Sequence, residues 1–290
     1  MNDPIPNSQF WLPGPTVKAL LQCYDYPHPL KPGKIIRGYD KAHARRTAKM
    51  CGAVARYLGY RPERLEAFQV ACLLHDMGRA GLDRKVFGAI WSWARSRGIP
   101  TRPAEWRAAY PDTVYGKETE AFWKIYRPEV CKLGIEINSW TKEQVEMRLG
   151  YARRLRRCMR QIKPVLQRLG IRWSTWMEKV CLYYYYPEKL VRGPAWVREL
   201  GEILVACEQL EAYSNRQRGS DYYNRSGENF VAAFSYLDEL CRRGQLSRKV
   251  LSAVRCLTSK GSFDSILMSA RKREFTAKER RFLRSLNPGE

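Results

Sequence analysis

The sequence predicts an all-α protein, and two observations support this fold class. Apolar residues recur at spacings of three and four along several long stretches, which is typical of helices that bury one face. No stretch shows a convincing alternation of apolar and polar residues, as a half-buried strand would. The 290 residues are 44% hydrophobic, enough for a sizeable core in one large domain or two small ones.

The chain is strongly basic, with 52 Lys and Arg against 29 Asp and Glu and a net charge of +23. Such an excess attracts polyanions and anionic small molecules. The alternative, which the sequence leaves open, is a solvated basic surface that has no dedicated partner. The nine cysteines form no C-x-x-C pair, which favours reduced, partly buried thiols. No apolar run approaches the roughly 18 residues of a membrane helix, and no signal-peptide pattern is present, so we expect a cytoplasmic protein without a membrane partner.

Residues 1–36 are rich in proline and aromatic residues, so they cannot form one regular element. We expect an N-terminal arm that packs against the rest of the chain and contains a short helix near 15–23. The main helical domain then covers 37–290, with 88–140 as an insertion.

The first helix of the main domain is predicted over 40–58. One stripe of this helix has spacings of three and four, and it should face inward. The stripe consists of His43, Thr47, Met50, Cys51, Val54 and Leu58. A second helix begins at Pro62, is apolar almost all round near its end, and stops at Gly78 and Gly81. His75 and Asp76 lie at this stop, where His75 can meet His43.

Residues 88–140 combine five tryptophans with several arginines. Aromatic residues interleaved with arginines suit stacking on bases and pairing with phosphates. The alternative is an inserted helical segment whose tryptophans pack inside the protein. We favour packing, because tryptophan is mostly well buried.

The remaining helices are predicted from residues that cap helix ends and from the glycine and proline residues that end helices. Thr141 and Gln144 make a capping-box pattern that opens a long helix to about Leu169. A helix over 175–186 ends in the tyrosine run Tyr183–Tyr186 before a proline. Further helices are predicted over 195–213, 229–243, 247–258 and 276–285, with a polar loop over 217–228.

Potential metal ligands are concentrated at three residues of the chain, namely His43, His75 and Asp76. Imidazole nitrogens and a carboxylate suit divalent transition metals, and a bound metal lowers the pKa of its water. Arg79 adds a cation that can hold a phosphate oxygen. Together these groups supply the parts for phosphoester hydrolysis. The structural alternative is that the histidines are ordinary core residues.

The segments AHARRTA at 42–48 and ACLLHDMGRAGL at 71–82 resemble the HD superfamily of metal-dependent phosphohydrolases. They look closest to the HD-GYP branch, which is associated with hydrolysis of cyclic di-GMP. The likeness covers about 40–257, and weaker segments downstream fall in the order of that family's landmarks. It implies an HD-domain helical bundle with 88–140 as an enlarged helical insertion, and it makes His43, His75 and Asp76 the first metal ligands.

The departures from the family pattern imply a reduced site. Arg79 stands where the family usually has a lysine that contacts substrate, and further metal-binding histidines are replaced by Tyr151 and by the run Tyr183–Tyr186. The closing aspartate aligns with Cys207, or with Glu208 after a one-residue slip. The resemblance therefore implies at most one divalent transition metal, such as Mn or Fe, with Cys207 or Glu208 as an additional ligand.

Three functions are consistent with these observations. In the first, the protein is a phosphohydrolase acting on a nucleotide or cyclic dinucleotide through a metal-bound hydroxide. Asp76 and Arg79 would then be catalytic, and Arg79, Tyr185 and Tyr186 would contact substrate. In the second, a degenerate HD-GYP-like domain senses an anionic nucleotide without turnover. In the third, the basic helix over 153–163 and the insertion bind nucleic acid, which predicts a steep loss of affinity with salt.

Overall fold

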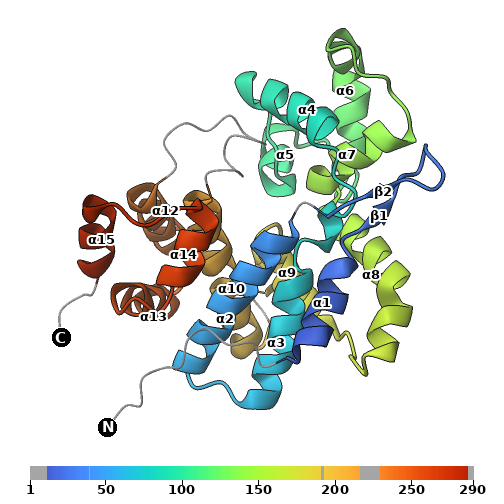
Figure 1. Ribbon diagram of the computed structural model, residues 1–290. Helices are drawn as coiled ribbons and strands as arrows, with labels where there is room; N and C mark the ends of the chain where they lie inside the picture. The colour runs from blue at the N-terminus through green and yellow to red at the C-terminus, as the bar shows by residue number, and fades with distance from the viewer. Residues whose placement is uncertain (1–11, 39, 191–192, 216–228, 287–290) are drawn as a thin grey trace.

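The computed structural model describes residues 12–38, 40–190, 193–215 and 229–286. Within these ranges the chain forms 14 α-helices, two short 3-10 helices and one pair of two-residue strands, which confirms the predicted all-α class. Figure 1 shows α4–α7 gathered at one end of the molecule and α12–α15 at another, with the remaining helices between them.

Five helices carry much of the main core. They are α1 (Gly14–Gln22), α2 (Lys41–Tyr57), α3 (Pro62–Leu74), α9 (Thr175–Leu182) and α10 (Ala195–Ser214). Every residue from 200 to 211 is buried, so α10 is the central helix. α2 packs against both α3 and α10. It approaches α3 closely, because a Cβ on Gly52 would stand 2.5 Å from Nε2 of Gln69.

The end of α3 is held in place by α8 (Tyr151–Arg168). After α3 the chain enters the 3-10 helix η1 (Met77–Arg79), which packs on α8. The fully buried guanidinium of Arg154 donates to the carbonyl oxygens of Gly78 at 3.3 Å and Ala80 at 2.6 Å, and it pairs with Glu143. These contacts fix the turn that carries His75 and Asp76.

A second hydrophobic cluster, separate from the main core, runs from Leu82 to Leu149 and includes the predicted insertion over 88–140. Its helices are α4 (Arg84–Ser96), α5 (Pro103–Ala109), α6 (Glu118–Lys132) and α7 (Ser139–Leu149). The buried tryptophans are Trp91, Trp106 and Trp140, which confirms the packing interpretation for these three.

The single helix predicted from 141 to about 169 is wrong. The chain forms α7 and α8 instead, with a break at Gly150, where a Cβ would stand 2.4 Å from Cγ of Glu146. The predicted capping box is also wrong. The side chain of Asn138 caps α7 by accepting from the N–H of Thr141, and the Thr141 hydroxyl donates to the carbonyl oxygen of Glu136 at 2.6 Å.

Other predicted boundaries hold within about a residue, with some exceptions. The helices over 40–58, 195–213, 229–243, 247–258 and 276–285 appear as α2, α10, α12 (Phe230–Arg242), α13 (Arg248–Ser259) and α15 (Ala277–Arg284). The helix over 175–186 ends early, at Leu182, so the whole tyrosine run lies beyond it. α14 (Asp264–Arg271) was not predicted. The predicted loop over 217–228 lies outside the described residues.

The described part of the N-terminal arm joins the main core. α1 packs on α2, α3 and α8, and the side chains of Leu20 and Tyr24 are buried there. The strands β1 (Tyr26–Pro27) and β2 (Ile35–Ile36) follow as a small antiparallel pair. Residues 1–11 of the arm lie outside the described part of the chain.

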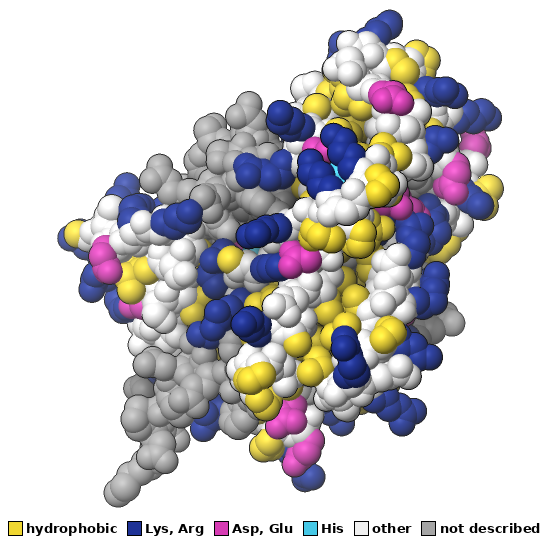
Figure 2. All heavy atoms as spheres, turned by 45° about the vertical axis from the view of Figure 1, so that its right-hand side comes forward, with side chains coloured by type: hydrophobic (Ala, Val, Ile, Leu, Met, Phe, Trp, Pro, Cys, Tyr) yellow, Lys and Arg dark blue, Asp and Glu magenta, His cyan; other side chains and the backbone are white. Residues whose placement is uncertain are grey.

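The surface of the molecule is basic. Figure 2 shows Lys and Arg side chains spread over the visible face, with Asp and Glu between them. In the described helices, no segment combines the length and the hydropathy that a membrane crossing requires.

Candidate metal centre

Four buried side chains from separate parts of the chain converge on one point. His43 comes from α2, His75 and Asp76 come from the turn after α3, and Glu208 comes from α10. One potential ligand atom from each lies within 4.8 Å of those of the other three. Two imidazole nitrogens and two carboxylates suit a divalent transition metal. The group could therefore hold one metal ion.

The imidazole of His75 is oriented by the backbone of its own helix. Its Nδ1–H donates to the carbonyl oxygen of Cys72 at 2.7 Å, since a carbonyl only accepts. The lone pair is therefore on Nε2, which lies 3.7 Å from Oδ2 of Asp76. Among the described residues this buried Nε2 has no hydrogen-bond partner. Buried polar atoms are normally satisfied, and a metal ion would satisfy this one.

The imidazole of His43 is oriented from α10 instead. Its Nδ1 is hydrogen bonded to a carboxylate oxygen of Glu211, which is itself paired with Arg46 at 2.5 Å. Nε2 of His43 also lies 3.7 Å from Oδ2 of Asp76. A carboxylate on the far nitrogen of a histidine is a common arrangement behind metal ligands, because it fixes the tautomer and raises the basicity of the ligand.

Glu211 was missed in the sequence, although a signal was present. Glu208 and Glu211 are separated by three residues, so they lie on one face of α10. Both are buried, and α10 carries them toward α2. Two acidic residues in the apolar stretch at the centre of α10 indicate polar partners inside the protein, although Glu199 and Glu202 repeat the same spacing one turn or more earlier.

Arg79 lies at the edge of the group. Its guanidinium donates to Oδ2 of Asp76 at 3.1 Å and to the hydroxyl of Tyr185 at 2.9 Å. The Tyr185 ring stacks on that of Tyr151, with centroids 4.3 Å apart. The Tyr151 hydroxyl donates to the carbonyl oxygen of His75.

The two stacked rings make an apolar wall beside the ligand group. Burial raises the pKa of Tyr151 far above its ordinary value, and the nearby Asp76 carboxylate raises it further. Burial also raises the pKa of Tyr185, although the Arg79 guanidinium opposes this effect. Both side chains therefore stay neutral phenols, and this wall adds no anionic ligand.

Cys207 and Glu208 occupy different surroundings although they are neighbours in the chain. Glu208 joins the ligand group, whereas Cys207 is not part of it and lies in the main core. Burial raises the pKa of the Cys207 thiol, and a hydrogen bond with the Cys51 thiol adds to this effect. A thiol binds metal as the thiolate, so this environment disfavours Cys207 as a ligand.

Tyr186, the other tyrosine predicted to contact substrate, is buried. The centroid of its ring lies 6.4 Å from that of Tyr115, which belongs to the segment 82–149. Tyr184 reaches the same region, where it is hydrogen bonded to Arg102. Of the tyrosine run, Tyr185 is the member whose hydroxyl reaches Arg79.

Two cavities flank α8, with volumes of about 620 and 610 Å³, and the four ligand side chains line neither of them. No protein-family model matches the chain, and no curated protein or solved structure is significantly similar to it. A function is therefore argued from the geometry of the buried group.

Proposed function

We propose that this protein is an HD-type metal-dependent phosphohydrolase with a single divalent transition metal, acting on a nucleotide or a cyclic dinucleotide. The observation that carries the proposal is the paired orientation of His43 and His75. Each ring has its Nδ1 committed to a partner and its Nε2 3.7 Å from the same Asp76 oxygen. Arg79 already pairs with that oxygen, and a metal ion beside it would in addition satisfy the buried Nε2 of His75, which has no hydrogen-bond partner among the described residues.

The proposed ligands are His43, His75, Asp76 and Glu208. This set of nitrogen and oxygen donors fits Mn or Fe, and a bound ion of this kind acts as a Lewis acid that lowers the pKa of water. Glu211 would hold His43 in the ligating tautomer. Arg79, steadied by Tyr185, would bind a phosphate oxygen of the substrate through its planar guanidinium. The net charge of +23 favours the approach of such an anion.

A second candidate function is nucleotide sensing without turnover. The observation that favours it is burial, since the four ligand residues are each at most 7% exposed. A phosphodiester must reach the ion to be hydrolysed, whereas a metal with a structural role needs no such access. In this case ligand binding near Arg79 would report to a partner protein. Nucleic-acid binding gains no such support, because Trp91, Trp106 and Trp140 are buried instead of forming a stacking surface.

Metal analysis and phosphodiesterase assays test the proposal directly. The purified protein should contain about one metal ion per chain, or take one up from added Mn or Fe, and should hydrolyse a cyclic dinucleotide or a nucleotide diester. His75→Ala and Asp76→Ala should lose both metal and turnover. Glu211→Gln keeps the ligands but removes the carboxylate behind His43, so it should weaken metal affinity by about 10- to 100-fold. Glu66→Gln, an exposed change on α3, is the matched control.

The outcomes separate the candidates. No bound metal, together with no turnover after addition of Mn or Fe, would remove the enzyme proposal. A His75→Ala protein that loses the metal but keeps full nucleotide affinity would favour the sensor. A Glu211→Gln protein with unchanged metal affinity would show that the carboxylate behind His43 does not support the site.

A further inference from the structure

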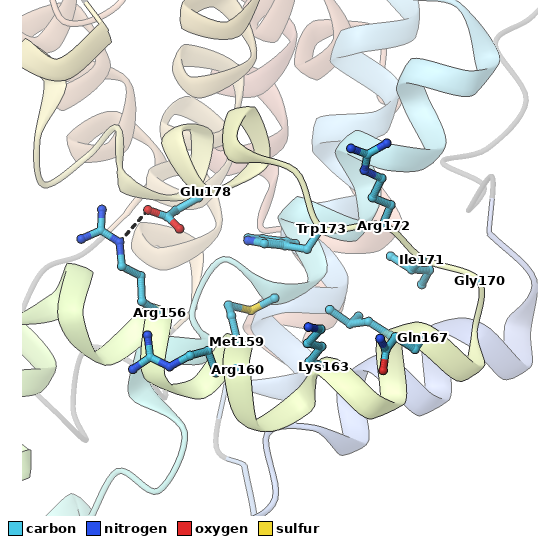
Figure 3. Close-up of a pocket in the computed structure, with 11 residues that line it drawn as sticks. Arg156, Met159, Arg160, Lys163, Gln167, Gly170, Ile171, Arg172, Trp173 and Glu178 are labelled. Atoms are coloured by element: carbon cyan, nitrogen blue, oxygen red, sulfur yellow. Dashed lines mark hydrogen bonds and ion pairs between the residues drawn. The ribbon is translucent and has the colours of Figure 1, made fainter.

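The larger of the two cavities beside α8 has the features of a ligand-binding site and lies apart from the candidate metal centre. It has a volume of about 620 Å³, is open to solvent on one side, and lies between α8 and the segment 170–178 that leads into and begins α9. Figure 3 shows side chains of α8 on one side of it and Trp173 on the other. Pockets for small organic ligands commonly have volumes of about 300–1,000 Å³.

The rim of this cavity is cationic. Arg156, Arg160 and Lys163 come from α8, and Arg172 comes from the loop before α9. Arg156 pairs with the one acidic lining residue, Glu178, at 2.8 Å. The other three cations are exposed and form no ion pair with the described residues. Four cations against one carboxylate make this a place for an anion.

The walls of the cavity are apolar and aromatic. Met159 and Leu166 come from α8, and Ile171 and Trp173 come from the opposite segment. Figure 3 shows Trp173 facing Met159 and Lys163 across the cavity. The indole Nε1 of Trp173 is buried and has no acceptor in the described part of the chain, although buried donors are normally paired. This atom is closed to solvent, so a molecule in the cavity would meet the Trp173 ring and not its N–H.

We propose that this cavity binds a nucleoside phosphate, with the base against Trp173 and Met159 and the phosphate held by Arg160 and Lys163. An aromatic side chain beside a cluster of cations suits a planar base that carries an anion. A lone inorganic anion would leave the aromatic wall unused. The site shares no lining residue with the metal centre, so it is independent of the proposed catalytic activity.

Calorimetric titration of the full chain with ADP, in the presence of a chelator, tests this site without the metal centre. A double charge reversal, Arg160→Glu with Lys163→Glu, and separately Trp173→Leu should each weaken ADP binding by about tenfold or more. The matched control is the double charge reversal Lys179→Glu with Lys278→Glu, two exposed changes of the same total charge that lie outside the cavity. His75→Ala should bind ADP as the wild type does.

Three results would overturn the proposal. The first is ADP affinity in the Arg160→Glu, Lys163→Glu protein equal to that of the control with Lys179→Glu and Lys278→Glu, which would show that the rim does not hold the phosphate. The second is inorganic phosphate binding as tightly as ADP, which would exclude recognition of the nucleoside. The third is loss of ADP binding in His75→Ala, which would place the nucleotide at the metal centre. The exposed charge variants should fold normally, so the test does not depend on Trp173→Leu.

Discussion

At the scale of single residues, Gly78 lies directly against the ring of Tyr151 beside the candidate metal centre. A Cβ on Gly78 would stand 2.5 Å from Cε2 of the Tyr151 ring. That ring cannot yield easily, because it is stacked on Tyr185 and its hydroxyl is bound to the carbonyl oxygen of His75. Gly78 is therefore required for space.

We predict that Gly78→Ala destabilises the protein by about 1–3 kcal/mol, the usual range for overpacking a well-filled core. Denaturant unfolding would measure the loss. Gly14→Ala is the matched control, since a Cβ on Gly14 meets nothing within 4 Å and should not reduce stability. Equal stability of the Gly78→Ala protein and the control would mean that the Tyr151 ring moves freely.

Single residues of the candidate site differ in how far the sequence predicts them. His43, His75 and Asp76 were recognisable because their motifs are local, and the partner of His75 Nδ1 lies only three residues away at Cys72. The partner of His43 is Glu211, 168 residues further along the chain. No local pattern encodes a contact over such a distance. The choice between Cys207 and Glu208 likewise depended on the rotation of α10, which packing sets.

At the scale of elements, the sequence predicts where most helices form, but it predicts the residues at which they begin and end less well. Hydrophobic periodicity placed α2, α10, α12, α13 and α15, because each buries one face or more. The division between α7 and α8 was missed, since the apolar pattern continues through Gly150, where the backbone leaves the helical conformation with φ −115° and ψ 25°. The position of the α7 cap depended on whether Asn138 or Thr141 faced the free N–H groups.

The cap of α15 gives a pH prediction. Burial by itself would raise the pKa of the Glu279 carboxyl, but the hydrogen bond from Arg273, with those from Thr276 and the charge of Arg271, outweighs burial and lowers the pKa to about 2. A folded-state pKa below the unfolded value stabilises the fold above the unfolded pKa of about 4.3. This contribution is lost as the pH falls from there toward 2.

Unfolding free energies measured across that pH range would show the effect. The stability difference between the wild type and Glu279→Gln should be largest above about pH 4.3 and should shrink as the carboxyl is protonated. Glu274→Gln serves as the control, because the Glu274 side chain is 79% exposed. A stability difference for Glu279→Gln that stays constant with pH would show that this carboxyl is not held by its arginines.

At the scale of the whole molecule, the candidate metal centre joins α2, the α3–η1 turn and α10. An ion that binds the folded chain and not the unfolded one stabilises the fold by mass action. The net charge of +23 destabilises the folded state, because like charges repel one another in a compact chain. The second hydrophobic cluster, from Leu82 to Leu149, adds apolar contacts of its own.

We therefore predict that the thermal unfolding midpoint rises with added Mn or Fe. At a free concentration of 100 times the Kd, the gain in unfolding free energy should be about 2.7 kcal/mol. Calorimetry at several metal concentrations would measure it. His75→Ala should show no metal-dependent rise, whereas the exposed control Glu66→Gln should behave as the wild type. A rise of equal size in His75→Ala would locate the responsible ion elsewhere.

The long separation between His43 and Glu211 has a consequence for biosynthesis. A growing chain presents His43, His75 and Asp76 well before Glu208 and Glu211 are made, and contacts over 168 residues close late because of their entropy cost. The early ligands would thus leave the ribosome without their remaining partners. Ion capture would mark completion of the fold, and a chain cut short before α10 would be unable to hold the ion.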